Sequence, residues 1–194
     1  MRKDEGRKVE IDNTRITKTF FLTSSFMFLL LVLLCSCSTV QENSQSHVIE
    51  DVPFYAQTSY QCGPASLAGV LNYWGIKVTP DEIAEEIYST SARGTLDIDM
   101  VLYARKRVLL VTQYEGTIED LRKNIDSRHP LIVLVDYGFS FMQKNHFIVV
   151  IGYNDHGVIV NSGKKKGKFV LEEDFLKSWE RTKFWTLLIT RTEN

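Results

Sequence analysis

A cysteine and a histidine stand in contexts that suit nucleophilic catalysis. Cys62 lies where a polar loop gives way to the apolar run after Gly63-Pro64, so we expect it at the start of a helix. The partial positive charge of a helix N-terminus stabilises a thiolate, the nucleophilic form of cysteine. His146 opens an apolar run after a polar turn, where its imidazole could take a proton from Cys62 and return it to a leaving amine. The two residues predict attack by a thiol on a carbonyl carbon.

Two side-chain amides could complete this site. Gln57 lies in the loop before Cys62, and its amide could donate a hydrogen bond to an oxyanion beside the helix start. Asn161 ends the apolar run that follows the strand of His146, and its amide oxygen could hold the imidazole in the useful tautomer. Simpler interpretations stay open: Cys62 as a small buried side chain, Gln57 as a surface residue with Gln61 as a competitor, and Asn161 as a turn residue.

Apolar spacing predicts that helices occupy the first half of the folded region. The second of them has the clearest start, because Thr79 can serve as its N-cap and Glu82 closes a capping box. Gly75 is expected to end the helix that begins near Cys62. The expected helices cover 64–74, 80–87, 98–106 and 118–125.

Apolar, β-branched runs predict strands in the second half. The turn sequence Asn154–Gly157 separates two such runs and indicates an antiparallel hairpin. The lysine-rich segment Lys164–Lys168 is interpreted as an exposed hairpin tip, with contact to anionic lipid head groups as an alternative. Helices followed by antiparallel strands indicate an α+β fold with two packed lobes. The expected strands cover 108–111, 131–135, 147–151, 158–160 and 184–189, with a short helix at 175–179.

The N-terminal segment has the pattern of an export signal. A positively charged stretch precedes a largely apolar one, in which Phe26–Leu34 is unbroken. The next residues, Leu34-Cys35-Ser36-Cys37, resemble the bacterial lipobox, which implies cleavage after Ser36 and a lipid thioether on Cys37. A membrane anchor that is never cleaved is the alternative, although the unbroken run is short for a span. The expected divisions are a signal peptide over 1–36, a lipid-anchored tether over 37–51 and a folded domain over 52–194.

Two blocks of the sequence carry a family resemblance. The first comprises Val52–Gln57 and Cys62–Gly75, and the second runs from His146 to Asn161. Together they resemble the bacteriocin-processing, double-glycine-leader cysteine peptidases, which are papain-like, over about residues 52–190. The resemblance implies a papain-like fold in which an N-terminal helical lobe packs on an antiparallel sheet. It places Cys62 as nucleophile, His146 as base, Gln57 as oxyanion donor and Asn161 at the orienting position, where this family usually has aspartate.

The resemblance also implies an activity and its surroundings. We expect a stand-alone, exported cysteine peptidase that hydrolyses peptide bonds through an acyl-enzyme on Cys62 and needs no metal or organic cofactor. Its partners would be a peptide or protein substrate and the membrane, reached through the lipid on Cys37. It would lie in the bacterial cell envelope, on the outer membrane facing the periplasm or on the outer face of a single plasma membrane. The alternatives are a thiol acyltransferase or transpeptidase on the same fold, and a non-catalytic lipoprotein that binds a peptide.

Composition excludes several other classes. The 194 residues include 23 Lys+Arg and 24 Asp+Glu, so no basic excess points to nucleic acid. Three cysteines are too few for a disulfide scaffold, and no CxxC or HExxH spacing indicates zinc. If Cys35 leaves with the signal peptide and Cys37 carries lipid, Cys62 is the free thiol of the mature chain. A thiol kept in an exported protein is consistent with a chemical role.

Overall fold

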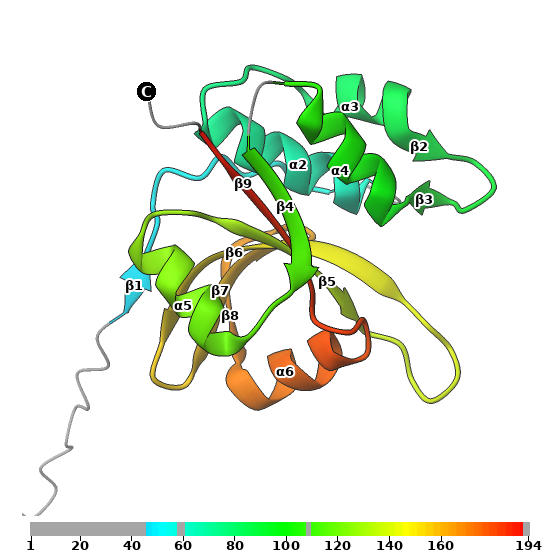
Figure 1. Cartoon of the computed structure of the whole chain (residues 1–194). Helices are drawn as coiled ribbons and strands as arrows, with labels where there is room; N and C mark the ends of the chain where they lie inside the picture. The colour runs from blue at the N-terminus through cyan, green and yellow to red at the C-terminus, as the bar shows by residue number, and fades with distance from the viewer. Residues whose placement is uncertain (1–45, 58–60, 108–109, 192–194) are drawn as a thin grey trace, which may run out of the picture. The chain divides into compact units, whose positions relative to one another are not determined.

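An antiparallel sheet forms the framework of the computed structural model, which describes residues 46–57, 61–107 and 110–191 (Figure 1). The described residues belong to one unit, Ser44–Asn194. Along the sheet the strands follow the order β4-β9-β5-β6-β7-β8, and β1 pairs with one end of β6. The strands are β1 (His47–Val48), β4 (Leu110–Glu115), β5 (Leu131–Asp136), β6 (Asn145–Asn154), β7 (Gly157–Ser162), β8 (Lys165–Leu171) and β9 (Trp185–Thr190).

Helices lie on both sides of this sheet. On one side α2, α3 and α4 are grouped together, α6 lies on the other side, and α5 packs beside β1 and β6 (Figure 1). The helices are α2 (Cys62–Tyr73), α3 (Pro80–Ile87), α4 (Asp97–Arg105), α5 (Ile118–Asp126) and α6 (Glu172–Glu180). The expected α+β fold, with a helical lobe packed on an antiparallel sheet, is confirmed. Among the described helices, none has the length and apolar character needed to cross a membrane.

The central strands are buried on both faces, which explains their apolar sequence. In β5 five of six residues are buried, and in β6 the run Phe147–Gly152 is buried throughout. Strands covered on both faces read as continuous apolar runs because neither face meets water. Leu67 and Leu71 of α2 are fully buried, as are Val133 and Ile148 of the central strands. This core fixes the start of α2 relative to the start of β6.

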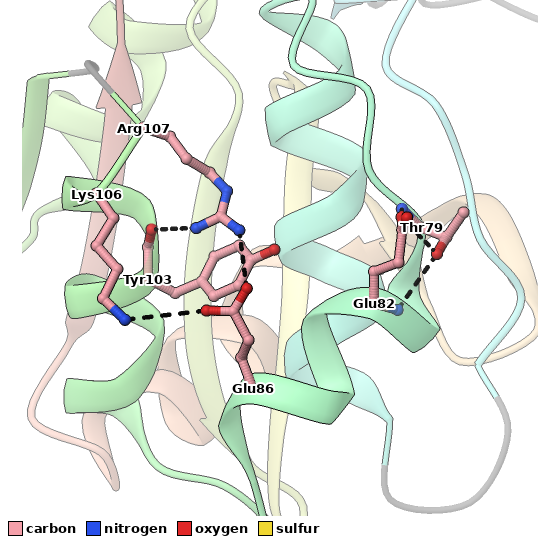
Figure 2. Close-up of polar contacts among 6 residues, drawn as sticks. All are labelled: Thr79, Glu82, Glu86, Tyr103, Lys106 and Arg107. Carbon is pink, nitrogen blue, oxygen red and sulfur yellow. Dashed lines mark hydrogen bonds and ion pairs between the residues drawn. The ribbon is translucent and has the colours of Figure 1, made fainter.

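The predicted capping box is present at the start of α3. Thr79 Oγ1 accepts a hydrogen bond from the Glu82 N–H (3.3 Å), and the Glu82 carboxylate accepts one from the Thr79 N–H (2.7 Å) (Figure 2). Figure 2 also shows how α3 is joined to the end of α4: Arg107 pairs with Glu86 (3.2 Å), and its guanidinium lies over the Tyr103 ring. These contacts stabilise the packing of α3 and α4 beside α2.

The N-terminal boundary of the folded domain is corrected by the structure. We expected a tether as far as residue 51, but His47 and Val48 pair with Tyr153 and Gly152 of β6, and Ile49 is buried. The domain therefore begins before Val52, because an edge of β6 is available to pair with this segment. The expected signal peptide over 1–36, Cys37 and the rest of the tether lie outside the described residues, as do residues 108–109 of one expected strand.

Three further strands were not predicted. The short strands β2 (Tyr88–Ser89) and β3 (Gly94–Thr95) form a two-stranded hairpin. The lysine-rich segment is more than a hairpin tip, because most of it belongs to β8, which pairs with β7 along the edge of the sheet. Charged side chains are tolerated there because an edge strand is exposed, and lysines discourage pairing with another chain.

Candidate active site

Cys62 is the first residue of α2, and Gln61 is its N-cap. Pro64 fits the first turn of the helix, where backbone N–H groups have no intrahelical partner. Gly63 allows the helix start to lie against β3, because a Cβ at this position would be 2.8 Å from the Cβ of Thr95. Cys62 is half-buried and lines the same cavity as Gly94 and Thr95 of β3.

Burial has the largest influence on the Cys62 thiol. It raises the pKa of the thiol above its ordinary value, while hydrogen bonds from the backbone N–H groups of Phe147, Gly63 and Cys62 oppose the shift. The sequence predicted that the helix N-terminus would favour a thiolate, but the cost of desolvating the charge exceeds these favourable contacts. The thiol of the free protein is therefore protonated at neutral pH.

His146 is the second residue of β6 and pairs with Val135 of β5. Its ring lies 5.7 Å from the Tyr137 ring, measured between centroids. Burial lowers the pKa of His146 to about 4, and the positive charges of Lys144 and Lys168 contribute to the same shift. The imidazole is consequently neutral at pH 7 and has a nitrogen that can accept a proton.

The side chain of Gln57 is held by Gly163, the residue after β7. The Gly163 N–H donates to Gln57 Oε1 (3.2 Å), and the Gln57 N–H donates to the Gly163 carbonyl (2.9 Å). Because the amide oxygen is engaged with the backbone, the amide NH₂ group is the end of this side chain that can donate elsewhere.

Three of the four predicted catalytic residues line one cavity. Gln57, Cys62 and His146 face a space of about 1070 Å³ that also includes Thr95 of β3 and Phe147 of β6. Within the described residues, no hydrogen bond joins the Cys62 sulfur to the His146 ring. Catalytic hydrogen bonds are often long in unliganded enzymes and shorten when substrate binds, so the absence of this bond is compatible with proton transfer in the substrate complex.

The fourth predicted residue, Asn161, lies on the other face of the sheet. It pairs with Val149, which is three residues after His146, and side chains alternate between faces along a strand. Its Oδ1 accepts from the Gly167 N–H (3.0 Å), and it does not line the cavity. The expectation that Asn161 orients His146 is therefore corrected: its amide oxygen serves the β7–β8 hairpin.

Two hydroxyl groups occupy the face of the sheet that carries His146. Ser162 follows Asn161 and so points to the opposite face, where it forms a hydrogen bond with the Tyr137 hydroxyl. Burial raises the pKa of the Tyr137 phenol, and the bond with Ser162 opposes that shift. Sequence reasoning missed both residues. The available signal was that Tyr137 directly follows the strand that precedes and pairs with that of His146.

The remaining candidates near Cys62 have other roles. Gln61 donates through Nε2 to Asp81 of α3 (3.1 Å), so its side chain is engaged away from the Cys62 cavity. No group of three or more His, Cys, Asp or Glu side chains that could hold a metal ion occurs in the part of the chain that the structure describes.

The close approach of Gly63 to Thr95 makes a testable prediction. We expect Gly63→Ala to destabilise the fold by about 1–3 kcal/mol, because the added Cβ overpacks the contact with the Thr95 side chain of β3. Chemical denaturation measures the loss. Gly94→Ala is the matched control, since a Cβ there meets nothing closer than 4.0 Å. Adding Thr95→Gly to Gly63→Ala should restore part of the stability, and a double variant no better than the single one would contradict this explanation.

The chain belongs to the Peptidase_C39 like family. A sequence model of that family matches residues 49–186, which confirms the resemblance seen in the Cys62 and His146 blocks. Among curated proteins, an uncharacterised protein of Methanothermobacter thermautotrophicus is 32% identical over 109 residues, covering 56% of this chain and 69% of the relative. A protein of Methanothermobacter marburgensis is 30% identical over 114 residues, covering 59% and 72%.

Solved structures show the same fold. A C39-like protein from Bacillus anthracis has a TM-score of 0.67 at 19% identity and covers 77% of this chain and all of its own. The peptidase domain of ComA, a bifunctional ABC transporter of Streptococcus, has a TM-score of 0.61 at 22% identity, covering 73% and 99%. A double glycine motif protease from an AMS/PCAT transporter, in complex with its leader peptide, has a TM-score of 0.59 at 24% identity, covering 73% and 92%. The described residues thus adopt the papain-like fold of C39 peptidase domains.

Proposed function

We propose that this protein is a cysteine peptidase that hydrolyses peptide bonds through an acyl-enzyme on Cys62. The observation that carries the proposal is the placement of Cys62, His146 and Gln57 around one cavity in a member of the C39-like family. A nucleophile, a base and an oxyanion donor are the minimum set for acyl transfer. The crystallised protease with a bound leader peptide supports a peptide as the kind of substrate.

The proposed reaction starts from a neutral pair. His146 takes the Cys62 proton as the sulfur adds to the carbonyl carbon, which gives a tetrahedral oxyanion and an imidazolium. When the C–N bond breaks, the imidazolium protonates the departing amine and a thioester remains on Cys62. Water then attacks the thioester with His146 as base, releasing the acid and restoring the thiol. The depressed pKa of His146 keeps the ring uncharged and ready to accept the first proton.

Gln57 is assigned to the oxyanion. Its Oε1 is occupied by the Gly163 N–H, so its NH₂ group is left to donate to the oxyanion together with the backbone N–H of Cys62. Gln57→Glu keeps an acceptor for Gly163 but removes this donor. We expect kcat to fall by about 10²–10³ in steady-state assays, the usual effect of losing one oxyanion donor. Gln143→Glu, at another lining residue, is the control, and a Gln57→Glu variant as active as that control would contradict the role.

We assign the orientation of His146 to Tyr137 with Ser162, in place of Asn161. Tyr137→Phe removes the hydroxyl that bonds to Ser162 but keeps the ring beside His146, so we expect kcat/KM to fall about five- to tenfold, equivalent to one hydrogen bond. Asn161→Ala should leave kcat/KM within about twofold and lower stability instead, because it loses the bond from Gly167. Kinetics and denaturation of both variants make the comparison, and the reverse pattern would restore Asn161 to the site.

The proposed function is tested by looking for its covalent intermediate. Wild-type protein is incubated with a panel of quenched-fluorescent peptides, quenched in acid and analysed by mass spectrometry. We expect cleaved peptide together with an acyl group on Cys62. If cleavage appears only when an amine or thiol is added, and a conjugate forms, the protein is an acyltransferase. Binding of peptides with no acylation of Cys62 would establish a non-catalytic binding module.

We further propose that the protein is lipid-anchored in the bacterial cell envelope through Cys37. The support is the lipobox-like sequence Leu34–Cys37. The tether would join the domain at β1, which pairs with Gly152 and Tyr153 near the end of β6. His146 lies at the start of the same strand, so the attachment point would be remote from it. Metabolic labelling with an alkyne fatty acid that persists in Cys37→Ala would contradict lipidation at this cysteine.

A further inference from the structure

The charged side chains that line the Cys62 cavity all carry the same sign. They are Arg93, Lys144 and Lys164, and no acidic side chain is among the described residues that line it. Each comes from a different turn: Arg93 lies between β2 and β3, Lys144 just before β6, and Lys164 between β7 and β8. The cations are therefore distributed around the cavity rather than along one strand.

Among the residues that the structure describes, no carboxylate forms an ion pair with these three cations. In the described part of the chain, the ion pairs of arginine and lysine side chains involve other residues, namely Lys106, Arg107, Arg122, Arg128 and Arg181. Acids near these cations in sequence do not line the cavity. Asp97 and Asp99 open α4, and Asp136, which accepts a hydrogen bond from the backbone N–H of Lys144 (2.7 Å), is buried and paired with the Arg181 guanidinium (2.8 Å). The positive potential of the cavity is thus left for a ligand.

The potential already acts on the reacting groups. Burial has the largest influence on the pKa of His146, and the charges of Lys144, which lines the cavity, and of Lys168 in β8 lower this pKa further. The same field stabilises negative charge that enters the cavity or develops there. Clefts lined by one sign of charge concentrate field lines, which raises the local concentration and association rate of oppositely charged ligands.

We propose that the cavity selects peptides that carry a carboxylate close to the scissile bond, either an acidic side chain or a free terminal carboxylate. Arg93, Lys144 and Lys164 would hold this group while the neighbouring carbonyl meets Cys62. The inference rests on the proposed peptidase function for the reaction itself, and on the unpaired cations for the selectivity. It adds a substrate class to that function.

The first test measures charge selectivity without requiring turnover. The full chain in neutral detergent is alkylated with iodoacetate, which is anionic, and iodoacetamide, which is neutral, and modification of Cys62 is followed by mass spectrometry. We expect the ratio of the two rates to exceed that of the urea-unfolded chain by about threefold or more at low salt, and to fall as salt screens the cations. At pH 7 the His146 ring is neutral, because its pKa is lowered to about 4, so His146 does not supply the positive charge.

Matched variants test whether the three cavity cations cause the difference in alkylation rate. Lys144→Gln, Lys164→Gln and Arg93→Gln should each lower the alkylation ratio, whereas Lys123→Gln on α5, outside this cavity, should leave it at the wild-type value. A ratio equal to that of the unfolded chain, or unchanged in all three cavity variants, would overturn the proposal whatever the enzymatic activity.

The second test uses peptides. Cys62→Ala protein is titrated by fluorescence anisotropy with peptides that differ only in Glu, Gln or Lys beside one bond, and with a terminal carboxylate in place of a carboxamide. We expect the glutamate peptide or the terminal-carboxylate peptide to bind at least about fivefold more tightly than its uncharged counterpart. The peptide that gains more affinity identifies whether the carboxylate comes from a side chain or from the peptide terminus. Equal binding of all peptides would overturn the proposed substrate class. Selective binding and alkylation without any cleavage by wild-type protein would instead refute the peptidase function and leave an anion-selective binding site.

Discussion

Replacing Cys62 by alanine is expected to reduce peptide hydrolysis by about 10⁴-fold or more, because Cys62 carries the only thiol among the described residues that line the cavity. The effect should appear in kcat, since the missing atom forms a bond in the reaction and contributes little to binding the peptide. Peptide cleavage under single-turnover conditions, read by mass spectrometry, measures it.

The fold should survive this substitution. Cys62 is only half-buried and α2 retains its packed residues Leu67 and Leu71, so thermal unfolding of Cys62→Ala should stay close to that of the wild type. Cys62→Ser provides a second variant of nearly the same size, and it should be almost as inactive because the neutral His146 is a weak base for a hydroxyl group. A Cys62→Ala protein that keeps one hundredth of the wild-type rate would refute the assignment of the nucleophile.

Replacing His146 by alanine should lower kcat/KM by about 10³-fold or more, because the protonated Cys62 thiol then has no base beside it. The raised pKa of the thiol makes this loss large: a thiol that ionised by itself at pH 7 would need the base less. His129→Ala, in the loop before β5, is the control and should retain activity. If the His146→Ala enzyme kept the wild-type rate at neutral pH, the Cys62 thiolate would form without a neighbouring base, which would contradict the role of His146.

The same argument fixes the pH dependence. The pKa of His146 is lowered to about 4, so the base stays unprotonated as the pH falls from 7, and the acid limb of kcat/KM should lie near 4 instead of near 6.5. Lys144→Gln removes one cation that depresses this pKa and should move the limb upward, toward 6.5. The alkaline limb should be displaced upward from the range of an ordinary thiol, because burial raises the pKa of Cys62. An acid limb that stays in place in Lys144→Gln would contradict the electrostatic origin of the shift.

Local sequence was sufficient for most of the elements. Thr79 and Glu82 predict the start of α3 because the capping box involves residues three apart, and Gly157 with Asn154 predicts the turn between β6 and β7 for the same local reason. Cys62 at a helix start and His146 at a strand start could also be located by pattern. The segment around His47 could not, because its strand exists only through pairing with β6.

The error at Asn161 has a specific cause in the sheet. A regular hairpin closed at Asn154 and Gly157 would pair Asn161 with Val150, on the same face as His146. The observed register shifts between Val150 and Gly152, so that Asn161 pairs with Val149 instead. An extra residue in one strand shifts the pairing of every later residue, so that the paired side chains lie on the other face of the sheet. The local sequence contains no signal that predicts this bulge.

Local patterns of apolarity and turns in the sequence predicted the α+β fold, and the resemblance of the Cys62 and His146 blocks indicated the family. Reactive side chains at a helix start and a strand start led us to propose Cys62, His146 and Gln57 as site residues. The tertiary structure determined the strand register, the burial of the site residues and the grouping of charges, which those local patterns do not contain. It placed Ser162 with Tyr137 on the face of His146, and it buried Cys62 enough that desolvation outweighs the helix N-terminus. It also gathered Arg93, Lys144 and Lys164 from three separate turns around one cavity. These outcomes depend on strand register and on burial, which arise only when distant parts of the chain pack together.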